Sequence, residues 1–244
     1  MKLTVLGNNG PYPKAGGACS GYLVESSNTK ILLDCGNGIL ARLQKICNIY
    51  DIDAIILSHL HSDHISDIMV LKYAIGINKV RKNLDLSIPL YTATDDQNII
   101  NKLNYNEAFK IEPIEDESKI RIKNLDIEFK RMKHPVEAYG IKINDGNKSF
   151  VYSGDTSYHD ELIEFVKDAD FFLCEAGILE KDKTEDSPHL SPKEAGDVAE
   201  KANVKRLVLT HFWPEYRLDK IMNEAKETYD GILELSEEMK TYYI

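Results

Sequence analysis

The stretch Ser58-His59-Leu60-His61-Ser62-Asp63-His64 places four potential metal ligands within six residues, directly after the apolar run 52–57. We expect this run to form a buried strand, so that the ligands lie on the loop at its carboxyl end. Imidazole and carboxylate groups together suit a borderline divalent ion such as zinc. A short turn can direct His59 and His61 to one ion while Asp63 and His64 face another. The loop therefore predicts a metal site rather than a polar surface turn that happens to be rich in histidine.

Polar residues end or follow apolar runs at four further places along the chain. These residues are Asp34, Asp155, Glu175 and His211. In layered α/β proteins, ligands gather beyond the carboxyl ends of strands, because several loops converge there. Core filling does not explain a repeated arrangement of this kind, so the pattern indicates one site built from distant segments.

The order of these motifs resembles the metallo-β-lactamase superfamily of metal-dependent hydrolases. H-x-H-x-D-H at 59–64 is followed by an isolated His134, then by Gly154-Asp155-Thr156 and by Thr210-His211. Within the superfamily the chain is most similar to the ribonuclease Z-like branch, over nearly its whole length. The segments that carry this similarity are Leu6-Gly7, Leu33-Asp34-Cys35-Gly36-Asn37-Gly38, Cys174-Glu175-Ala176, His189-Leu190-Ser191, Ala195-Gly196 and Leu207-Val208-Leu209-Thr210-His211-Phe212.

The resemblance implies an α/β fold, a four-layer αββα sandwich, and two divalent metal ions per chain, with zinc ahead of manganese or iron. The residues implied to hold one ion are His59, His61 and His134, and those implied for the other are Asp63, His64 and His211. Asp155 is implied to bridge the two ions. With 244 residues, 43% hydrophobic content and no Pro/Gly/Ser linker, residues 1–244 are expected to form a single hydrolase domain.

The ligand types also indicate the chemistry. Two divalent ions about 3.5–4 Å apart can share a water, lower its pKa and stabilise the attacking and leaving oxygens at phosphorus. We expect Asp63 to orient and deprotonate that water. The resemblance implies that His189 protonates the leaving oxygen and that Glu175 orients His189. For Asp34 two interpretations stay open, namely a partner of a ligating histidine or a charge at a helix N-terminus.

The leading functional hypothesis is a binuclear metal-dependent hydrolase that cleaves phosphodiester bonds in a small or short anionic substrate. Hydrolysis of a thioester, lactone or other carboxylic ester is the alternative, because the same activated water attacks acyl carbon. Two departures from ribonuclease Z limit the comparison. Positions 135–154 suffice for a hairpin through Asn144-Asp145-Gly146-Asn147 but not for the long arm that grips transfer RNA. The N-terminal loop 11–20 also lacks the Arg-Asn pair of those enzymes.

The charge balance disfavours long nucleic acid as a partner. The chain has 30 basic and 40 acidic residues and a net charge of −10, whereas proteins that bind phosphate backbones normally show a basic face. Of two short basic clusters, 79–82 and 130–133, the second adjoins His134 and is the better candidate for steering an anionic substrate.

The expected compartment is the cytoplasm, without membrane contact. No apolar run of 18 residues occurs, the N-terminal strand is too brief for a signal-peptide core, and the four cysteines lack C-x-x-C spacing. A homodimer is compatible with the sequence.

Periodicity predicts strands and helices that alternate in two halves. Expected strands lie near 2–6, 21–25, 30–34, 52–57, 87–91, 171–174 and 206–210, with a strand-rich stretch at 119–153. Expected helices lie near 38–46, 66–78, 95–104, 159–167, 192–202 and 215–228. Ser191-Pro192-Lys193-Glu194 predicts a capping box with proline at the first helical position.

Overall fold

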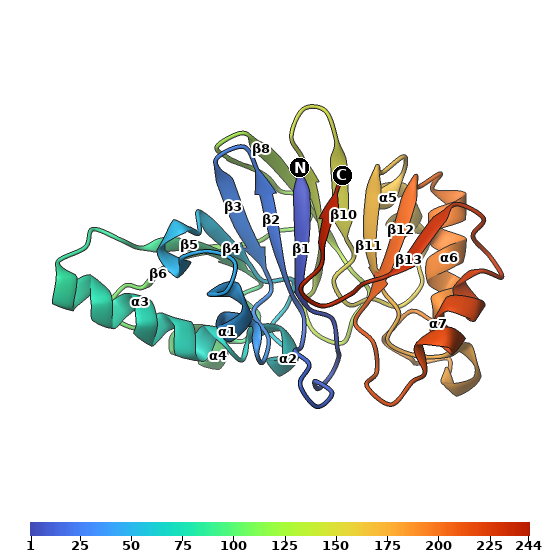
Figure 1. Ribbon diagram of the computed structural model, residues 1–244, viewed down its shortest axis with the longest axis horizontal. Coiled ribbons are helices and arrows are strands. Elements are labelled where there is room, and N and C mark those ends of the chain that lie inside the picture. Colours follow the sequence, from blue (N-terminus) through green and yellow to red (C-terminus); the bar gives the residue numbers. More distant parts are fainter.

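The computed structural model describes residues 1–244 and shows two seven-stranded mixed sheets packed face to face. Helices cover the outer face of each sheet, so that the layers run helix, sheet, sheet, helix (Figure 1). The expected αββα sandwich is thereby confirmed.

The first sheet comes mainly from the N-terminal half and has the order β14-β1-β2-β3-β4-β5-β6. Its strands are β1 (Lys2–Gly7), β2 (Gly21–Ser26), β3 (Thr29–Leu33), β4 (Ala54–Ile56), β5 (Ile88–Thr92), β6 (Phe109–Pro113) and β14 (Thr241–Tyr243). Pairing is antiparallel from β14 to β3 and parallel from β3 to β6. Because β14 pairs with β1, the two chain ends lie side by side (Figure 1).

The second sheet has the order β13-β12-β11-β10-β9-β8-β7. Its strands are β7 (Lys119–Ile122), β8 (Leu125–Arg131), β9 (Tyr139–Asn144), β10 (Ser149–Tyr152), β11 (Phe171–Glu175), β12 (Arg206–Thr210) and β13 (Ile232–Leu235). Pairing is antiparallel from β7 to β10 and parallel from β10 to β13. β9 and β10 form the hairpin expected at 144–147, and no longer arm extends from it.

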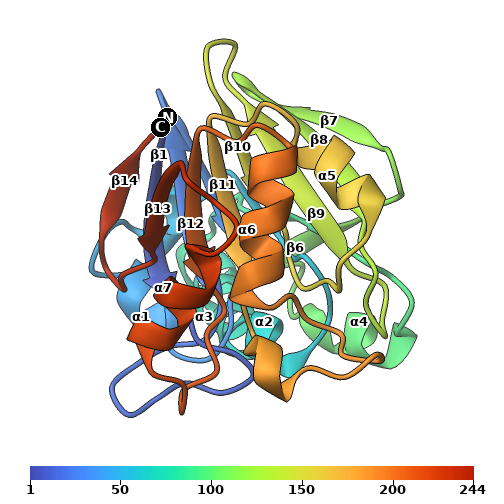
Figure 2. The same ribbon diagram turned by 90° about the vertical axis from the view of Figure 1, so that its right-hand side faces the viewer.

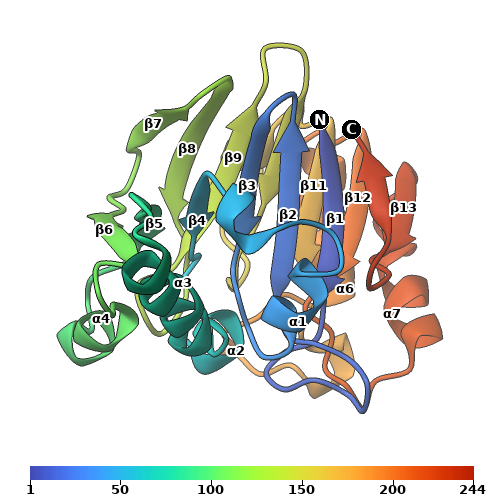
Figure 3. The same ribbon diagram turned by 60° about the vertical axis from the view of Figure 1, so that its left-hand side comes forward.

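Seven helices flank the sheets. α1 (Ile39–Leu43), α2 (Ser62–Ile65), α3 (Ile68–Lys82) and α4 (Gln97–Leu103) lie on the side of the first sheet (Figure 3). α5 (Asp160–Val166), α6 (Pro192–Lys201) and α7 (Leu218–Ala225) lie over the second (Figure 2). Two short 3₁₀ turns span Ile49–Asp51 and Glu180–Asp182. The predicted capping box begins α6, with the Ser191 side chain accepting a hydrogen bond from Glu194 N. None of the helices is long and apolar enough to cross a membrane.

The core has three apolar clusters, one between the sheets and one between each sheet and its helices. In β4, Ile56 packs between the sheets while its neighbour Ile55 packs toward the helices. Strands that are buried on both faces read as continuous apolar runs. This packing explains why the strands that lead to the site were predictable from the sequence.

The structure differs from the expected elements at one helix and three strands. The helix expected at 66–78 is α3, and the short helix α2, which carries Asp63 and His64, lies where a loop was expected. Asp67 separates the two helices, because its N donates to Cys35 O and its carboxylate accepts from Leu40 N. The strands β6, β13 and β14 were not expected. Each lies at a sheet edge, where pairing with a neighbour rather than an apolar pattern fixes the strand conformation.

Candidate metal centre

The ends of several strands converge at one edge of the sandwich. β3 leads to Asp34, β4 to the loop 57–61, β10 to Asp155 and β12 to His211. α2, which carries Asp63 and His64, marks this edge at the bottom of Figure 1. The topology therefore brings the predicted site residues together from both halves of the chain.

Three of these strand ends turn through a left-handed backbone conformation. The φ angles are 53° at Asp34, 60° at Gly154 and 58° at His211. For a residue other than glycine this conformation costs on the order of 1–3 kcal/mol, and it persists only where the surroundings enforce it. The turns direct the chain away from each strand immediately beyond its last residue.

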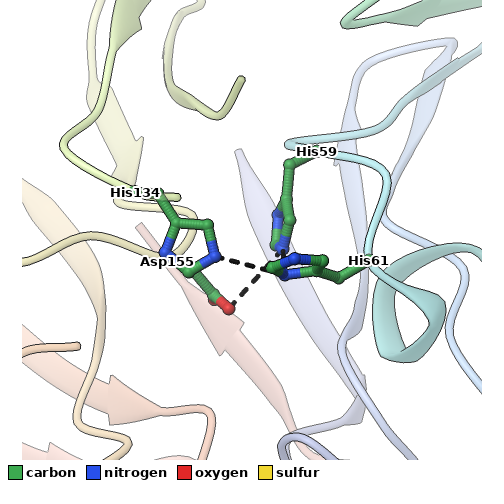
Figure 4. Close-up of side chains that lie close together, drawn as sticks. All are labelled: His59, His61, His134 and Asp155. Atoms are coloured by element: carbon green, nitrogen blue, oxygen red, sulfur yellow. Dashed lines mark hydrogen bonds and ion pairs between the residues drawn. The ribbon is translucent and has the colours of Figure 1, made fainter. Parts of the chain in front are cut away.

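One ligand cluster contains His59, His61, His134 and Asp155, which point toward one another (Figure 4). Nδ1 of His61 lies 3.0 Å from Nε2 of His59 and 3.2 Å from Nε2 of His134. The Asp155 carboxylate lies 3.7 Å from Nε2 of His59. Ligand atoms about 2.0–2.1 Å from a tetrahedral ion are roughly 3.3–3.4 Å apart. The cluster therefore has the spacing of a metal site.

A second cluster contains Asp63, His64 and His211. Oδ2 of Asp63 lies 3.2 Å from Nε2 of His211 and 3.5 Å from Nε2 of His64. Oδ2 of Asp155 lies 3.3 Å and 3.4 Å from the same two nitrogens. Asp155 thus belongs to the surroundings of both clusters, in the position that the resemblance implied for a bridging ligand.

Unpaired polar atoms test whether these residues fit a metal. Nε2 of His64 and Oδ1 of Asp155 are buried and have no hydrogen-bond partner. A buried polar atom without a partner costs about 1–3 kcal/mol. Imidazole nitrogens and carboxylate oxygens are donors for zinc, iron and manganese. The residues present fit divalent metal ions.

Asp34 fixes the orientation of His64. Its carboxylate accepts hydrogen bonds from Nδ1 of His64 (2.8 Å), the Tyr152 hydroxyl (2.8 Å) and Ser58 N (2.7 Å). Nε2 of His64 is thereby left for the ligand cluster. Of the two interpretations open for Asp34, the structure shows the partner of a histidine. The N-terminal position of α1 is taken by Asp67, which accepts from Leu40 N.

The pKa values of His59 and His64 are shifted in opposite directions. Burial lowers the pKa of His59 well below its ordinary value, so this imidazole is neutral and its lone pair is free. Burial also lowers the pKa of His64, but the carboxylates of Asp155 and Asp34 outweigh burial and raise this pKa well above its ordinary value. Since a ligating nitrogen must be deprotonated, a metal ion that binds here displaces a proton from His64.

The buried Glu175 and the half-buried His189 form a pair beside the clusters. Oε1 of Glu175 accepts hydrogen bonds from Nδ1 of His189 (3.0 Å) and Thr156 N (2.8 Å). Nδ1 of His189 is 4.0 Å from Oδ2 of Asp155. Burial lowers the pKa of His189, but Glu175 and Asp155 outweigh burial and raise it to about 9. His189 can therefore hold a proton on Nε2. It also groups with Asp155 and His211 within 4.8 Å, so metal ligation is chemically open to it too.

Sequence reasoning missed two residues that shape the site. Tyr152 was assigned only to a strand, although the hydroxyl of a buried tyrosine requires a partner, and here that partner is Asp34. Gly10 lies in none of the predicted strands or helices. A Cβ at Gly10 would lie 2.0 Å from Nε2 of His211. Only glycine allows this loop to approach the imidazole so closely, and no local signal in the sequence reveals the contact.

Gly10→Ala is expected to weaken metal binding by roughly 10–100-fold. This is the range found when residues that hold a metal ligand in position are mutated. The added methyl collides with His211 and displaces either that ligand or the N-terminal loop. Titration with a competing chelator measures the effect. Gly16→Ala is the matched control, because nothing lies within 4 Å of its added methyl. Its φ of 75° makes Gly16→Ala less stable without touching His211. Unchanged metal affinity in Gly10→Ala would show that the contact is not needed.

Comparison with known proteins identifies the class. Residues 29–212 match the β-lactamase superfamily domain, and the chain belongs to this family. It is a metallo-hydrolase, and its His and Asp clusters are suited to divalent metal ions.

Individual proteins of known sequence or structure are similar to this chain. The chain is 34% identical over 232 residues to the probable metallo-hydrolase YhfI of Bacillus subtilis, covering 95% of each protein. The crystal structure of YhfI matches with a TM-score of 0.94 at 31% identity, over 99% of this chain and 98% of that one. Ribonuclease Z of Halorubrum lacusprofundi is 26% identical over 288 residues, covering 95% of this chain and 93% of that protein. The human short-form tRNase Z shares the fold, with a TM-score of 0.79 at 20% identity over 100% of this chain and 99% of that one.

Proposed function

We propose that this metallo-hydrolase is a phosphodiesterase that works with two divalent ions, zinc in the first instance. The observation that carries the proposal is the 3.0 Å contact between Glu175 and His189 beside Asp155. An alkoxide is a poor leaving group, so its departure from phosphorus benefits from a positioned acid. In the alternative reaction, hydrolysis of a thioester, the leaving group is a thiolate, which departs readily and needs a general acid less. The relationship to a ribonuclease Z from Halorubrum lacusprofundi supports phosphodiester chemistry.

The chain's own groups divide the proposed work. Ions held in the two clusters would lower the pKa of a shared water and stabilise charge on the attacking and leaving oxygens. Asp63 orients the attacking water and accepts its proton. His189 donates the proton on Nε2 to the leaving oxygen. Glu175 holds the opposite nitrogen of His189 and stabilises the imidazolium.

Space around the centre favours a small substrate. A polar cavity of about 590 Å³ adjoins His134, and its lining combines Lys133 with carboxylates that include Glu185 and Asp186. The neighbouring Lys130 and Arg131 pair with Glu117 and Glu137 instead, so the cluster 130–133 does not form a continuous basic face. A small or short phosphodiester fits this setting better than a long nucleic acid does.

A small aryl phosphodiester is expected to be cleaved with a kcat/KM at least tenfold above that for a thioester, a lactone or a transfer-RNA precursor. The proposed two-ion centre stabilises the attacking and leaving oxygens at phosphorus, and the missing arm and the acidic surface disfavour the precursor. Initial rates for the four substrates with zinc-loaded protein measure this order. Efficient 3′ trimming of the precursor at physiological salt would contradict the restriction to small substrates. Faster turnover of the thioester or lactone would assign the carboxylic-ester alternative.

A further inference from the structure

A second cavity, of about 300 Å³, opens beside His189 and His211. Its walls include Pro11, Ile178, Trp213 and Tyr216, and we call it the ring pocket. Small-molecule pockets typically measure roughly 300–1,000 Å³, so the ring pocket can take one compact group. It differs in character from the polar cavity next to His134.

Consecutive residues of one short segment line the two different cavities. Ser187 and Pro188 line the polar cavity, whereas the next residue, His189, lines the ring pocket. A phosphodiester carries two ester arms on one phosphorus. The centre therefore offers a polar cavity for one arm and an apolar, aromatic cavity for the other.

The aromatic wall is held by its neighbours before any ligand arrives. The ring of Trp213 meets Tyr12 edge-on at 5.7 Å and Tyr216 at 6.3 Å between centroids. The Tyr12 hydroxyl donates to Glu215 (2.8 Å), which anchors that ring. Trp213 also lies two residues after His211, so its position is tied to a ligand residue. A rigid wall lowers the entropy cost of binding a flat ring.

We propose that the ring pocket binds a flat aromatic ring on the leaving arm of the phosphodiester. The proposal rests on the proposed function, since His189 as the acid defines which arm leaves. His189 lines the ring pocket and not the polar cavity, so the oxygen that it protonates carries the arm held by Trp213 and Tyr216. Stacking on aromatic side chains accepts any ring with a π-face, aryl or nucleobase.

The hydrolysis balances in this orientation. The water oxygen bonds to phosphorus while its proton passes to Asp63. The bond from phosphorus to the oxygen of the ring-bearing arm breaks, and that oxygen takes the proton of His189. The products are the ring-bearing alcohol and a phosphate monoester of the other arm.

Binding can be measured through Trp213, which is the only tryptophan of the chain. Zinc-loaded protein is titrated with phenylphosphonate and methylphosphonate, and separately with a purine nucleoside monophosphate and ribose 5-phosphate. Each pair shares its phosphorus group and differs in the ring, and the two pairs distinguish an aryl ring from a nucleobase. The ring-bearing member of at least one pair is expected to change Trp213 fluorescence with a roughly tenfold lower dissociation constant.

Variants localise the effect. Tyr216→Leu is expected to remove most of the preference for the ring. Tyr243→Leu is the matched control, because Tyr243 is 76% exposed in β14, at the opposite edge of the sandwich. Equal affinities within both pairs, or the same loss in both variants, would overturn the ring pocket whether or not diesters are cleaved.

The orientation is tested with benzyl methyl phosphate, whose two leaving oxygens have similar basicity. Benzyl alcohol and methyl phosphate are expected as the main products, and Tyr216→Leu should reduce this bias. Methanol and benzyl phosphate as the main products, or an even mixture, would overturn the assignment of the leaving arm. Ring binding without cleavage of any diester would instead overturn the phosphodiesterase function and leave the ring pocket standing.

Discussion

Asp155→Asn is expected to lower kcat/KM by roughly 10³-fold, which corresponds to a loss of about 4 kcal/mol of transition-state stabilisation. Oδ2 of Asp155 lies 3.3 Å, 3.4 Å and 3.7 Å from the Nε2 atoms of His211, His64 and His59. Asparagine keeps the shape of aspartate but removes the negative charge and replaces one oxygen by an amide nitrogen that cannot act as a ligand. The surroundings of both clusters are therefore weakened by one substitution.

The number of bound ions shows whether Asp155→Asn loses activity because it binds less metal or for another reason. Elemental analysis after metal-replete preparation is expected to give two divalent ions per parent chain and fewer in Asp155→Asn. His159→Asn is the control, because His159 lies outside the ligand clusters and asparagine is a favoured residue at its position, the N-cap of α5. Asp155→Asn with two ions and full activity would contradict a bridging role. A parent chain with one ion or fewer would contradict the binuclear centre itself.

His189→Ala is expected to keep both ions but to lose about 10²–10⁴-fold in turnover on a diester with an unactivated leaving group. The loss should be smaller when the leaving group is an acidic phenol, which departs without a proton. The alkaline limb of the pH–rate profile, which belongs to the acid, should also disappear. A loss of bound metal would instead show that His189 is a ligand in the group with Asp155 and His211.

Glu175→Gln is expected to follow the same trend more weakly. Glutamine still accepts the hydrogen bond from Nδ1 of His189, but it no longer stabilises the positive charge. The pKa of His189 should fall in this variant, because the Glu175 carboxylate is the largest influence that raises it. Rates with activated and unactivated leaving groups across pH measure this shift. Full activity of His189→Ala on an unactivated diester would remove the main support for the phosphodiesterase over the ester hydrolase.

The position of the site was predictable because its ligands lie close together in sequence or directly follow apolar strands. His59, His61, Asp63 and His64 occupy one short segment, and the structure joins them with His134, Asp155 and His211 in two clusters. The apolar runs also placed the main strands correctly. Whether each residue holds a metal stays a prediction, which the ion counts above test.

Other features of the site depend on contacts that the sequence does not record. The left-handed turns at Asp34 and His211 are imposed by the packing around the strand ends. The residue types aspartate and histidine do not by themselves predict this backbone conformation. The contact between Gly10 and His211 joins opposite ends of the chain. The ring pocket likewise arises only when Pro11 meets the segments that carry Ile178 and Trp213. Long-range packing, rather than local preference, determines these features.

The division of ligands between the two halves has a consequence for how the protein matures. Each cluster combines side chains of the segment 58–64 with residues from the second half, His134 and Asp155 in one case and His211 in the other. A nascent chain that has made only its first half displays an incomplete and open set of ligands. Such a set is expected to discriminate poorly among divalent ions, because selectivity depends on the geometry of the complete site. We therefore expect faithful metal loading to come late, after the second sheet has docked onto the first.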